Sequence, residues 1–281
     1  MVVVVTVAAV GCSLGVAGAA GIAWHASLPA ALQAAKQSGK LVMLSQQTEW
    51  CTWCQKLARE TWPAPAVVEK SAQFECVQIN AEKDEIEDRY KASGFPTILF
   101  LTADGEVAKR IEGYLAPEQF VKAMDEAVEG AKRLGEIKAL EKKLAENPGD
   151  RALAVQIGEL QIKMGNAKRA LELLQPVYEK LGELEESLRA AVLLGYGEAL
   201  VIDEQFEKGR TVLQEFVTRC PGDKRLADGH FVLGVALANL GKVAEARDEW
   251  QKTLTLDPKG PFAEQATAFI ERANQELGGK Q

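Results

Sequence analysis

Trp50-Cys51-Thr52-Trp53-Cys54 is the most informative segment in the first half of this chain. It follows a short apolar run and opens a helical pattern. Two thiols three residues apart on a first helical turn can close a small disulfide, and the unpaired N–H groups of the helix N-terminus favour a thiolate on the outer sulfur. We therefore expect a dithiol redox centre, with Cys51 as the exposed nucleophile and Cys54 as the resolving thiol.

Three other uses of a Cys-x-x-Cys pair compete with redox chemistry. Zinc needs four ligands, usually from a second pair, and the remaining cysteines and histidines are scattered singly. Covalent haem attachment requires His directly after the second cysteine, where this chain has Gln55. A purely structural disulfide between Cys51 and Cys54 stays open, although so short a loop gains little entropy from closure. We expect no metal, and no cofactor beyond the redox-active disulfide itself.

The composition sets the class of protein. At 281 residues the chain is long enough for two domains, and 47% apolar with 26% charged residues is typical of globular proteins. The net charge of -7 leaves no basic face for a phosphate backbone, so we expect no nucleic-acid partner. Five cysteines are too few for a disulfide-stapled scaffold.

Residues 1–23 carry no charge and consist almost wholly of Val, Ala and Gly. The small residues before Trp24 supply cleavage positions near Ala19 or Ala20, which predicts a secretory signal peptide. No basic residue precedes the apolar run, so a retained membrane anchor and a misassigned start are alternatives, as is lipidation at Cys12. Export would place the dithiol in an oxidising compartment, the periplasm or cell envelope, whereas a misassigned N-terminus would leave it cytoplasmic.

The pattern between Trp24 and residue 130 alternates between helices and strands. Ser27 can cap a helix that Gly39 ends, and Pro117 opens the last helix. Between them we expect strands at 41–44, 74–80, 97–101 and 107–111, the helix that carries the two cysteines, and an acidic helix at about 82–91.

At this point the first half resembles a thioredoxin-fold domain, most of all the exported, disulfide-interchange branch of that family. The similarity rests on the Trp-Cys-x-x-Cys helix start, on Gly94-Phe95-Pro96-Thr97 before an apolar strand, and on the hairpin turn Asp104-Gly105. These motifs occur in the family's order and spacing. The resemblance implies an α/β thioredoxin fold over residues 24–130.

The same resemblance implies roles for the residues around the dithiol. Pro96 would follow a cis peptide bond and lie beside the sulfurs, while Phe95 and Thr97 flank it and the Phe95 backbone pairs with a substrate peptide. Trp50 and Trp53 would form an apolar landing surface for the substrate. A plainer interpretation is that both are half-buried packing aromatics.

One position departs from the family pattern. Many thioredoxins carry a buried acid six residues before the first cysteine, where it helps to move the proton of the inner thiol, and here that position is Ser45. Proton transfer would then fall to Glu49 or to water. Cys76, in the middle of a predicted strand, is expected to be a buried small hydrophobe.

From about residue 131 to 281 the pattern becomes wholly helical and repeats at a spacing in the high thirties. Gly158, Gly197 and Gly234 recur at a position where two helices approach closely, and Gly165 and Gly241 mark turns between helices. This resembles the tetratricopeptide repeat (TPR). We expect an all-α TPR solenoid of about three units, with residues 134–146 as a half-repeat and Phe262 to Leu277 as a capping helix.

Stacked repeats offer a concave groove, which binds peptides or proteins in this family. A structural spacer or dimer element is the alternative. Cys220 is expected to be an incidental free thiol, and His230 a surface residue.

Two functions follow. The first is an exported thiol–disulfide oxidoreductase that acts on protein thiols and disulfides, exchanges electrons with a redox partner protein, and binds a peptide or protein through its repeats. The second is a thioredoxin–TPR holdase chaperone in which redox transfer is secondary.

Overall fold

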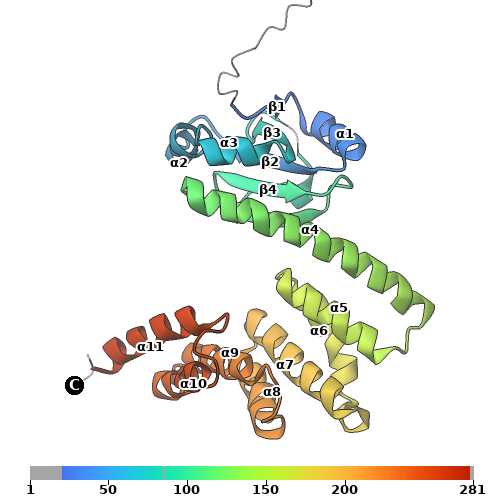
Figure 1. The fold of residues 1–281 in the computed structure, drawn as a ribbon, viewed down its shortest axis with the longest axis vertical. Coiled ribbons are helices and arrows are strands. Elements are labelled where there is room, and N and C mark those ends of the chain that lie inside the picture. Colours follow the sequence, from blue (N-terminus) through green and yellow to red (C-terminus); the bar gives the residue numbers. More distant parts are fainter. Residues whose placement is uncertain (1–20, 85, 279–281) are drawn as a thin grey trace, which may run out of the picture. The chain divides into compact units, whose positions relative to one another are not determined.

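A computed structural model of the chain describes residues 21–84 and 86–278 (Figure 1). These residues form two compact units that divide between Ala131 and Lys132. Most of the expected signal segment, residues 1–20, lies outside the described residues. Within the described ranges, no helix combines the length and apolarity needed to cross a membrane.

The first unit is built on a mixed five-stranded sheet. Its strands run in the spatial order β1-β3-β2-β4-β5; β1, β3 and β2 are parallel, and β4 and β5 are antiparallel to their neighbours. The strands are β1 (Trp24–His25), β2 (Leu41–Gln47), β3 (Phe74–Asn80), β4 (Thr97–Leu101) and β5 (Val107–Glu112). Strand β2 is longer than expected because its polar end keeps pairing with both neighbours, Ser45 with Gln78 and with Ile98.

Helices cover both faces of this sheet. They are α1 (Leu28–Ser38), α2 (Thr52–Lys56) with the π-helical segment Leu57–Thr61, α3 (Pro65–Ser71), the 3-10 turn Asp88–Tyr90, and α4 (Pro117–Glu146). Ser27 caps α1 through its hydroxyl, which accepts the Ala30 N–H at 3.3 Å, and Gly39 ends it at φ 74°. Both ends of α1 are therefore as the sequence predicted.

The two faces of the sheet have separate cores because alternate strand residues point to opposite sides. Met43, Cys76 and Phe100 belong to the core that also holds Leu57, Val67 and Phe120 from the helices after the cysteines. The opposite core holds α1 and Tyr90, with Leu44, Val77 and Leu99 from the sheet. Burial on both faces explains why the central strands read as continuous apolar runs.

The predicted helix at 82–91 is wrong. Asn80 and Asp84 capture the chain in a turn: the Asn80 side chain accepts the Glu82 N–H at 3.0 Å, and the Asp84 carboxylate accepts the Asn80 N–H at 2.7 Å. Tyr90 then anchors the segment from within the core by donating its hydroxyl to the Gly105 carbonyl at 2.6 Å. Among the described residues of this stretch, only Asp88–Tyr90 is helical, as a 3-10 turn. Local side-chain bonds of this kind compete with helix formation.

Two further differences concern helices. Helix α3, which begins with Pro65 at its first turn, was not predicted from the sequence. Helix α4 runs without a break through residues 134–146 and ends at Glu146, so the stretch expected as a half-repeat is the C-terminal part of a longer helix. Gly130 lies within α4 where an added Cβ would collide with the Ala108 carbonyl of β5, so its role is close packing and not helix termination.

The second unit consists of successive antiparallel helix pairs. They are α5 (Arg151–Lys163) with α6 (Ala167–Tyr178), α7 (Glu186–Ile202) with α8 (Phe206–Arg219), and α9 (Leu226–Asn239) with α10 (Val243–Leu256). A 3-10 turn, Leu181–Glu183, links the first two pairs, and α11 (Ala263–Gly278) packs on α10. The first helices α5, α7 and α9 also pack on one another, so they form one continuous layer of the array.

The repeated glycines lie where the helices of each pair approach closely. A Cβ at Gly158 would lie 2.8 Å from Leu174 Cγ, one at Gly197 would lie 2.7 Å from Leu213 Cγ, and one at Gly234 would overlap the Trp250 indole. Real Cβ atoms do not pack so tightly, so the prediction of close approach is confirmed at all three positions.

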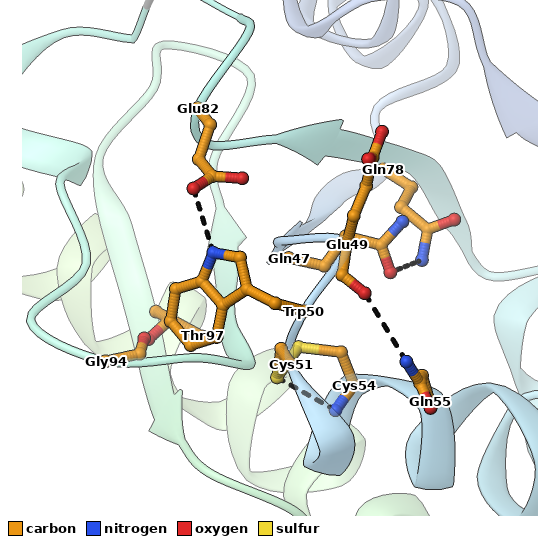
Figure 2. The surroundings of a disulfide bond; sticks show 10 residues. All are labelled: Gln47, Glu49, Trp50, Cys51, Cys54, Gln55, Gln78, Glu82, Gly94 and Thr97. Carbon is orange, nitrogen blue, oxygen red and sulfur yellow. Dashed lines mark hydrogen bonds between the residues drawn. A yellow bond between two sulfur atoms is a disulfide. The ribbon is translucent and has the colours of Figure 1, made fainter.

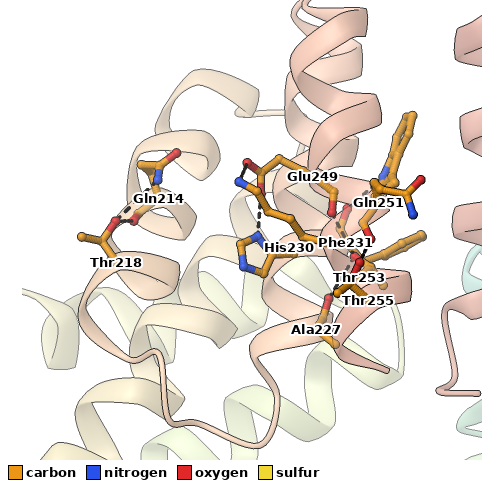
Figure 3. A network of polar contacts seen from close by, with 11 residues as sticks. Gln214, Thr218, Ala227, His230, Phe231, Glu249, Gln251, Thr253 and Thr255 are labelled. Atoms are coloured by element: carbon orange, nitrogen blue, oxygen red, sulfur yellow. Dashed lines mark hydrogen bonds and ion pairs between the residues drawn. The ribbon is translucent and has the colours of Figure 1, made fainter. Parts of the chain in front are cut away.

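The prediction for His230 is wrong, because its ring is buried between α9 and α10 (Figure 3). Its Nδ1 lies 2.5 Å from Glu249 Oε2, and Lys252 Nζ donates to the other oxygen of Glu249 at 2.7 Å. Placing a histidine on the inner face of α9 buries it, while the facing carboxylate provides the hydrogen-bond partner that a buried polar group requires.

Candidate functional site

The two cysteines sit where β2 leads into α2 (Figure 2). Cys51 is the N-cap of α2 and is disulfide-bonded to Cys54, with 5.2 Å between their Cα atoms. The Cys54 N–H donates to Cys51 Sγ at 3.0 Å, so the outer sulfur takes the place of a capping oxygen. Each cysteine keeps 4% of its surface exposed. The outer sulfur is thus placed at the helix start as the sequence predicted. The expected exposure of Cys51 is wrong, because its residue is as buried as Cys54.

The segment that holds Pro96 is fixed by hydrogen bonds, strand pairing and one aromatic contact. The Phe95–Pro96 peptide bond is cis, and the Gly113 N–H donates to the Pro96 carbonyl at 2.8 Å. Thr97, fully buried at the start of β4, donates its hydroxyl to the Gly94 carbonyl at 2.8 Å and pairs with Gln46 of β2. Phe95 packs edge-on against Trp50, with 6.1 Å between ring centroids. The structure therefore brings together the two motifs that lie some forty residues apart in the chain.

Trp50 and Trp53 are exposed, at 67% and 55% of their surface, so the interpretation of both as half-buried packing aromatics is wrong. The Trp50 Nε1–H donates to Glu82 at 2.8 Å, which orients this indole. Trp53 packs beside Tyr114, with 5.8 Å between centroids. Exposed tryptophans whose orientation is fixed in this way are typical of a binding surface.

Three residues of this surface were missed as site residues. Lys56 Nζ lies 4.5 Å from the Tyr114 ring centroid and 5.4 Å from that of Trp53, so its charge covers both rings. Tyr114 donates its hydroxyl to Glu60 at 2.7 Å, and this bond is the main cause that raises the pKa of the phenol. The sequence offered one signal, the placement of Lys56 and Glu60 at i and i+4 on the helix of the cysteines.

Glu49 precedes the dithiol, but its carboxylate points away from the sulfurs (Figure 2). It forms an ion pair with Lys83, and the hydrogen bond from that ammonium holds the pKa of the exposed carboxyl below its ordinary value. The suggested role of Glu49 in proton transfer stays a prediction. Ser45 is fully buried, and its hydroxyl has no hydrogen-bond partner among the described residues.

The two other cysteines of the described residues, Cys76 and Cys220, are buried. Cys76 is buried in β3, and burial raises the pKa of its thiol to about 12, so it is the small hydrophobe that the sequence predicted. Cys220 is free and buried at the end of α8. In the part of the chain that the structure describes, no three His, Cys, Asp or Glu side chains are grouped as metal ligands would be.

In the helical unit, a cavity of about 310 Å³ opens among α5, α7, α9 and the segment before α11. Most of its lining belongs to the first helix of each pair, with Pro261 and Phe262 from the segment before α11. The sequence predicted a groove in this unit without indicating which helices would line it.

A mixed sheet with a disulfide at the start of the helix after its central strand, facing a cis-proline segment, defines a thioredoxin-like fold. Helix pairs with small residues at their crossings define TPR architecture. The family comparison agrees with both. Residues 28–128 match the family model of the thioredoxin-like domain, and residues 227–259 match that of the tetratricopeptide repeat. The chain is therefore a thioredoxin-like domain followed by a TPR-type helical region.

Curated relatives match the first domain. The chain is 32% identical over 90 residues to the thiol:disulfide interchange protein DsbD of Actinobacillus pleuropneumoniae, covering 30% of this chain and 15% of that protein. It is 34% identical over 107 residues to the DsbD of Vibrio cholerae, covering 36% and 18%. The chain thus matches less than a fifth of the length of these relatives.

Solved structures each cover part of the chain. The DsbH oxidoreductase shares 22% identity at a TM-score of 0.34, covering 39% of this chain and 86% of that one. A MamA structure shares 22% identity at a TM-score of 0.43, covering 53% and 80%.

Proposed function

We propose that this protein is an exported thiol–disulfide oxidoreductase that acts on the thiols and disulfides of other proteins. The observation that carries the proposal is the Cys51–Cys54 disulfide at the N-terminus of α2, beside two exposed indoles. The name of the curated relatives, thiol:disulfide interchange protein, supports the same chemistry for the matched domain. No cofactor beyond the disulfide is required.

In the reducing direction, the Cys51 thiolate attacks one sulfur of a substrate disulfide and the other substrate sulfur leaves as a thiolate. Cys54 then attacks Cys51 Sγ in the mixed disulfide, which releases the second substrate thiol and closes Cys51–Cys54. Two electrons pass from the dithiol to the substrate, and a redox partner protein returns them. The Cys54 N–H that donates to Cys51 Sγ would stabilise negative charge on the outer sulfur.

Substrate positioning falls to the segment beside the sulfurs. Among the described residues, no hydrogen bond occupies the backbone N–H or carbonyl of Phe95, whereas the Pro96 carbonyl is bound by Gly113. A substrate backbone could therefore pair with Phe95 as a short added strand. Trp50 and Trp53 would cover the apolar side chains that flank the substrate cysteine.

The helical unit would bind a partner or substrate protein through the cavity lined by α5, α7 and α9. The match to the tetratricopeptide repeat supports this role. Export, with a cleaved or anchored N-terminus, rests on the uncharged apolar run at residues 1–23. A fusion of that segment to alkaline phosphatase, which is active only after export, would test it.

The enzymatic proposal is tested by insulin reduction and by refolding of scrambled ribonuclease. Cys51→Ala should abolish both activities, because no nucleophile remains. Cys54→Ala should keep the attack but accumulate mixed disulfides that dithiothreitol releases. Unchanged activity in the Cys51 variant would end the proposal, and Cys220→Ala, which removes a buried free thiol, serves as the control.

A holdase chaperone is the second candidate. It is favoured by the exposure of Trp50 and Trp53, which are two of the four exposed large hydrophobic side chains among the described residues. A holdase would suppress aggregation of an unfolding client even as the Cys51→Ala/Cys54→Ala double variant. Suppression that disappears with the thiols would exclude it.

A further inference from the structure

Four apolar side chains line the cavity in the helical unit: Ile162 of α5, Leu194 of α7, Val232 of α9 and Phe262 from the segment before α11. We call this set the apolar wall. The Phe262 ring is held by stacking on Phe231, with 4.4 Å between centroids and 11° between planes. This wall is a preformed surface for an aliphatic chain.

The polar side of the cavity is acidic, because its arginine is already bound. Arg225 donates to both carboxylate oxygens of Asp223 at 3.0 Å and to Glu159 at 3.0 Å. These two acids occupy the guanidinium from within the chain. Arg225 is therefore not free to neutralise the other carboxylates of the cavity.

Glu198 and Asp228 are those other carboxylates. In the part of the chain that the structure describes, neither forms an ion pair or a side-chain hydrogen bond. Burial, followed by repulsion from Asp228, raises the pKa of Glu198 to about 6, and burial likewise raises that of Asp228. Lys163 lines the same cavity and offsets part of this repulsion.

The charges in and beside the cavity can be compared directly. Glu159, Glu198 and Asp228 line it and Asp223 binds its arginine, against two cations, Lys163 and Arg225. Four acids against two bases leave an excess of two negative charges, half-buried beside apolar side chains. An added cation would therefore relieve repulsion that already exists in the folded protein.

We propose that this cavity binds a lysine or arginine side chain of an extended partner peptide, with the methylene stem on the apolar wall and the cationic head at Glu198 and Asp228. This proposal rests on the proposed partner-binding role of the helical unit and names the chemistry of that partner. Long basic side chains combine an apolar stem with a charged end, which is the combination that the two walls offer. A bare metal ion would leave the apolar wall unused.

The test uses the full-length protein and a phage-displayed heptapeptide library without cysteine. Selection should enrich lysine or arginine at one position, next to apolar residues. A synthetic peptide of the selected consensus is then compared by fluorescence anisotropy with versions that carry norleucine or glutamate instead. Each replacement should weaken binding about tenfold, equivalent to ~1.4 kcal/mol. No preference for basic residues, or binding of spermidine without binding of the lysine peptide, would overturn the proposal.

Variants of the two cavity carboxylates test whether the peptide binds in the cavity. Glu198→Gln and Asp228→Asn should each reduce the preference for lysine over norleucine, and the double variant should abolish it. Glu245→Gln removes an exposed carboxylate on α10 outside the cavity and should bind as the parent does. A preference retained by the double variant, with its thermal unfolding unimpaired, contradicts the assignment. Because the library lacks cysteine, Cys51→Ala should bind the peptide normally, so failure here is distinct from failure of the redox function.

Discussion

The Trp50 indole packs edge-on against the Phe95 ring, at an angle of 81° between their planes. One residue precedes the outer cysteine and the other precedes the cis-proline, so this contact links the two halves of the dithiol site. Glu82 holds the same indole from its polar edge, through a hydrogen bond of 2.8 Å. A fixed indole beside the sulfurs loses little side-chain entropy when a substrate covers it.

Trp50→Ala should therefore impair substrate binding more than folding. Removing an anchoring aromatic from a binding surface costs roughly 1–2 kcal/mol, so kcat/KM for insulin reduction should fall about 5- to 30-fold. The indole is mostly exposed, so the thermal midpoint should change little. Ile202→Ala, which removes an exposed hydrophobe in the helical unit, is the matched control and should leave kcat/KM unchanged. An equal loss in both variants would show that Trp50 has no specific role.

Glu49→Gln tests the remaining candidate for proton transfer. Lys83 holds the pKa of the Glu49 carboxyl below its ordinary value, and the side chain points away from the sulfurs, so we expect less than a twofold change in rate. The measurement is the pH profile of insulin reduction for both proteins. A loss of tenfold or more, with an altered acidic limb, would instead establish Glu49 as the proton acceptor.

Much of the fold could be predicted because its signals are local. The Ser27 cap, the Gly39 stop and the apolar strands each depend on neighbours in sequence. The wrong helix prediction at 82–91 and the missed helix α3 also have local causes. Asn80 and Asp84 replaced helical bonds with side-chain bonds, and α3 is a seven-residue helix with adjacent valines, whose propensity is weak.

The site was only partly predictable for a different reason. Cys51, Cys54 and the Pro96 segment form motifs that can be read directly from the sequence. Tyr114 reaches Trp53 only because the chain after β5 passes beside α2, a relation that no sequence spacing reveals. The acidic cavity likewise depends on α5, α7 and α9 packing together, and on Arg225 pairing with Asp223 and Glu159.

Two buried threonines, one before and one after the cysteines in the sequence, form a matched pair. Thr61 donates its hydroxyl to the Leu115 carbonyl at 2.8 Å, whereas the Thr48 hydroxyl has no partner among the described residues. Thr61→Val should destabilise the protein by about 1 kcal/mol, while Thr48→Val should be neutral or stabilising. Urea unfolding followed by tryptophan fluorescence measures both. Equal losses would mean that Thr48 binds an internal water molecule, which is then a structural element of the site.

The turn of the middle repeat carries a backbone cost that its neighbours avoid. Gly165 and Gly241 adopt φ of 77° and 75°, and the equivalent residue of the middle pair is Glu204, at φ 62°. A residue with a Cβ costs roughly 1–2 kcal/mol in this region, which is only partly offset by the greater unfolded-state entropy of glycine. Glu204→Gly should therefore stabilise the helical unit by about 0.5–1 kcal/mol in thermal unfolding. Glu179→Gly, where φ is -58°, should be destabilising instead.

The pKa of the Glu198 carboxyl is raised from its ordinary value of 4.5 to about 6. This shift makes the free energy of unfolding depend on pH, and its direction fixes the sign of the dependence. Below pH 4.5 the group is protonated in both the folded and the unfolded chain and contributes no penalty. Between pH 4.5 and 6 the unfolded chain releases the proton first, so the folded state loses stability, and above pH 6 the loss stays constant at roughly 1–2 kcal/mol.

Glu198→Gln removes that titration. The variant should be as stable as the parent at pH 4 and more stable by roughly 1–2 kcal/mol at pH 8. Asp228, Glu159 and Lys163 face the same cavity in both proteins, so the difference between the two unfolding curves isolates Glu198. Glu245→Gln should show no such pH-dependent gain. A variant that is less stable at pH 8 would mean that ionised Glu198 has a cationic partner within the folded chain, and the cavity would then have no excess of negative charge to offer a basic side chain.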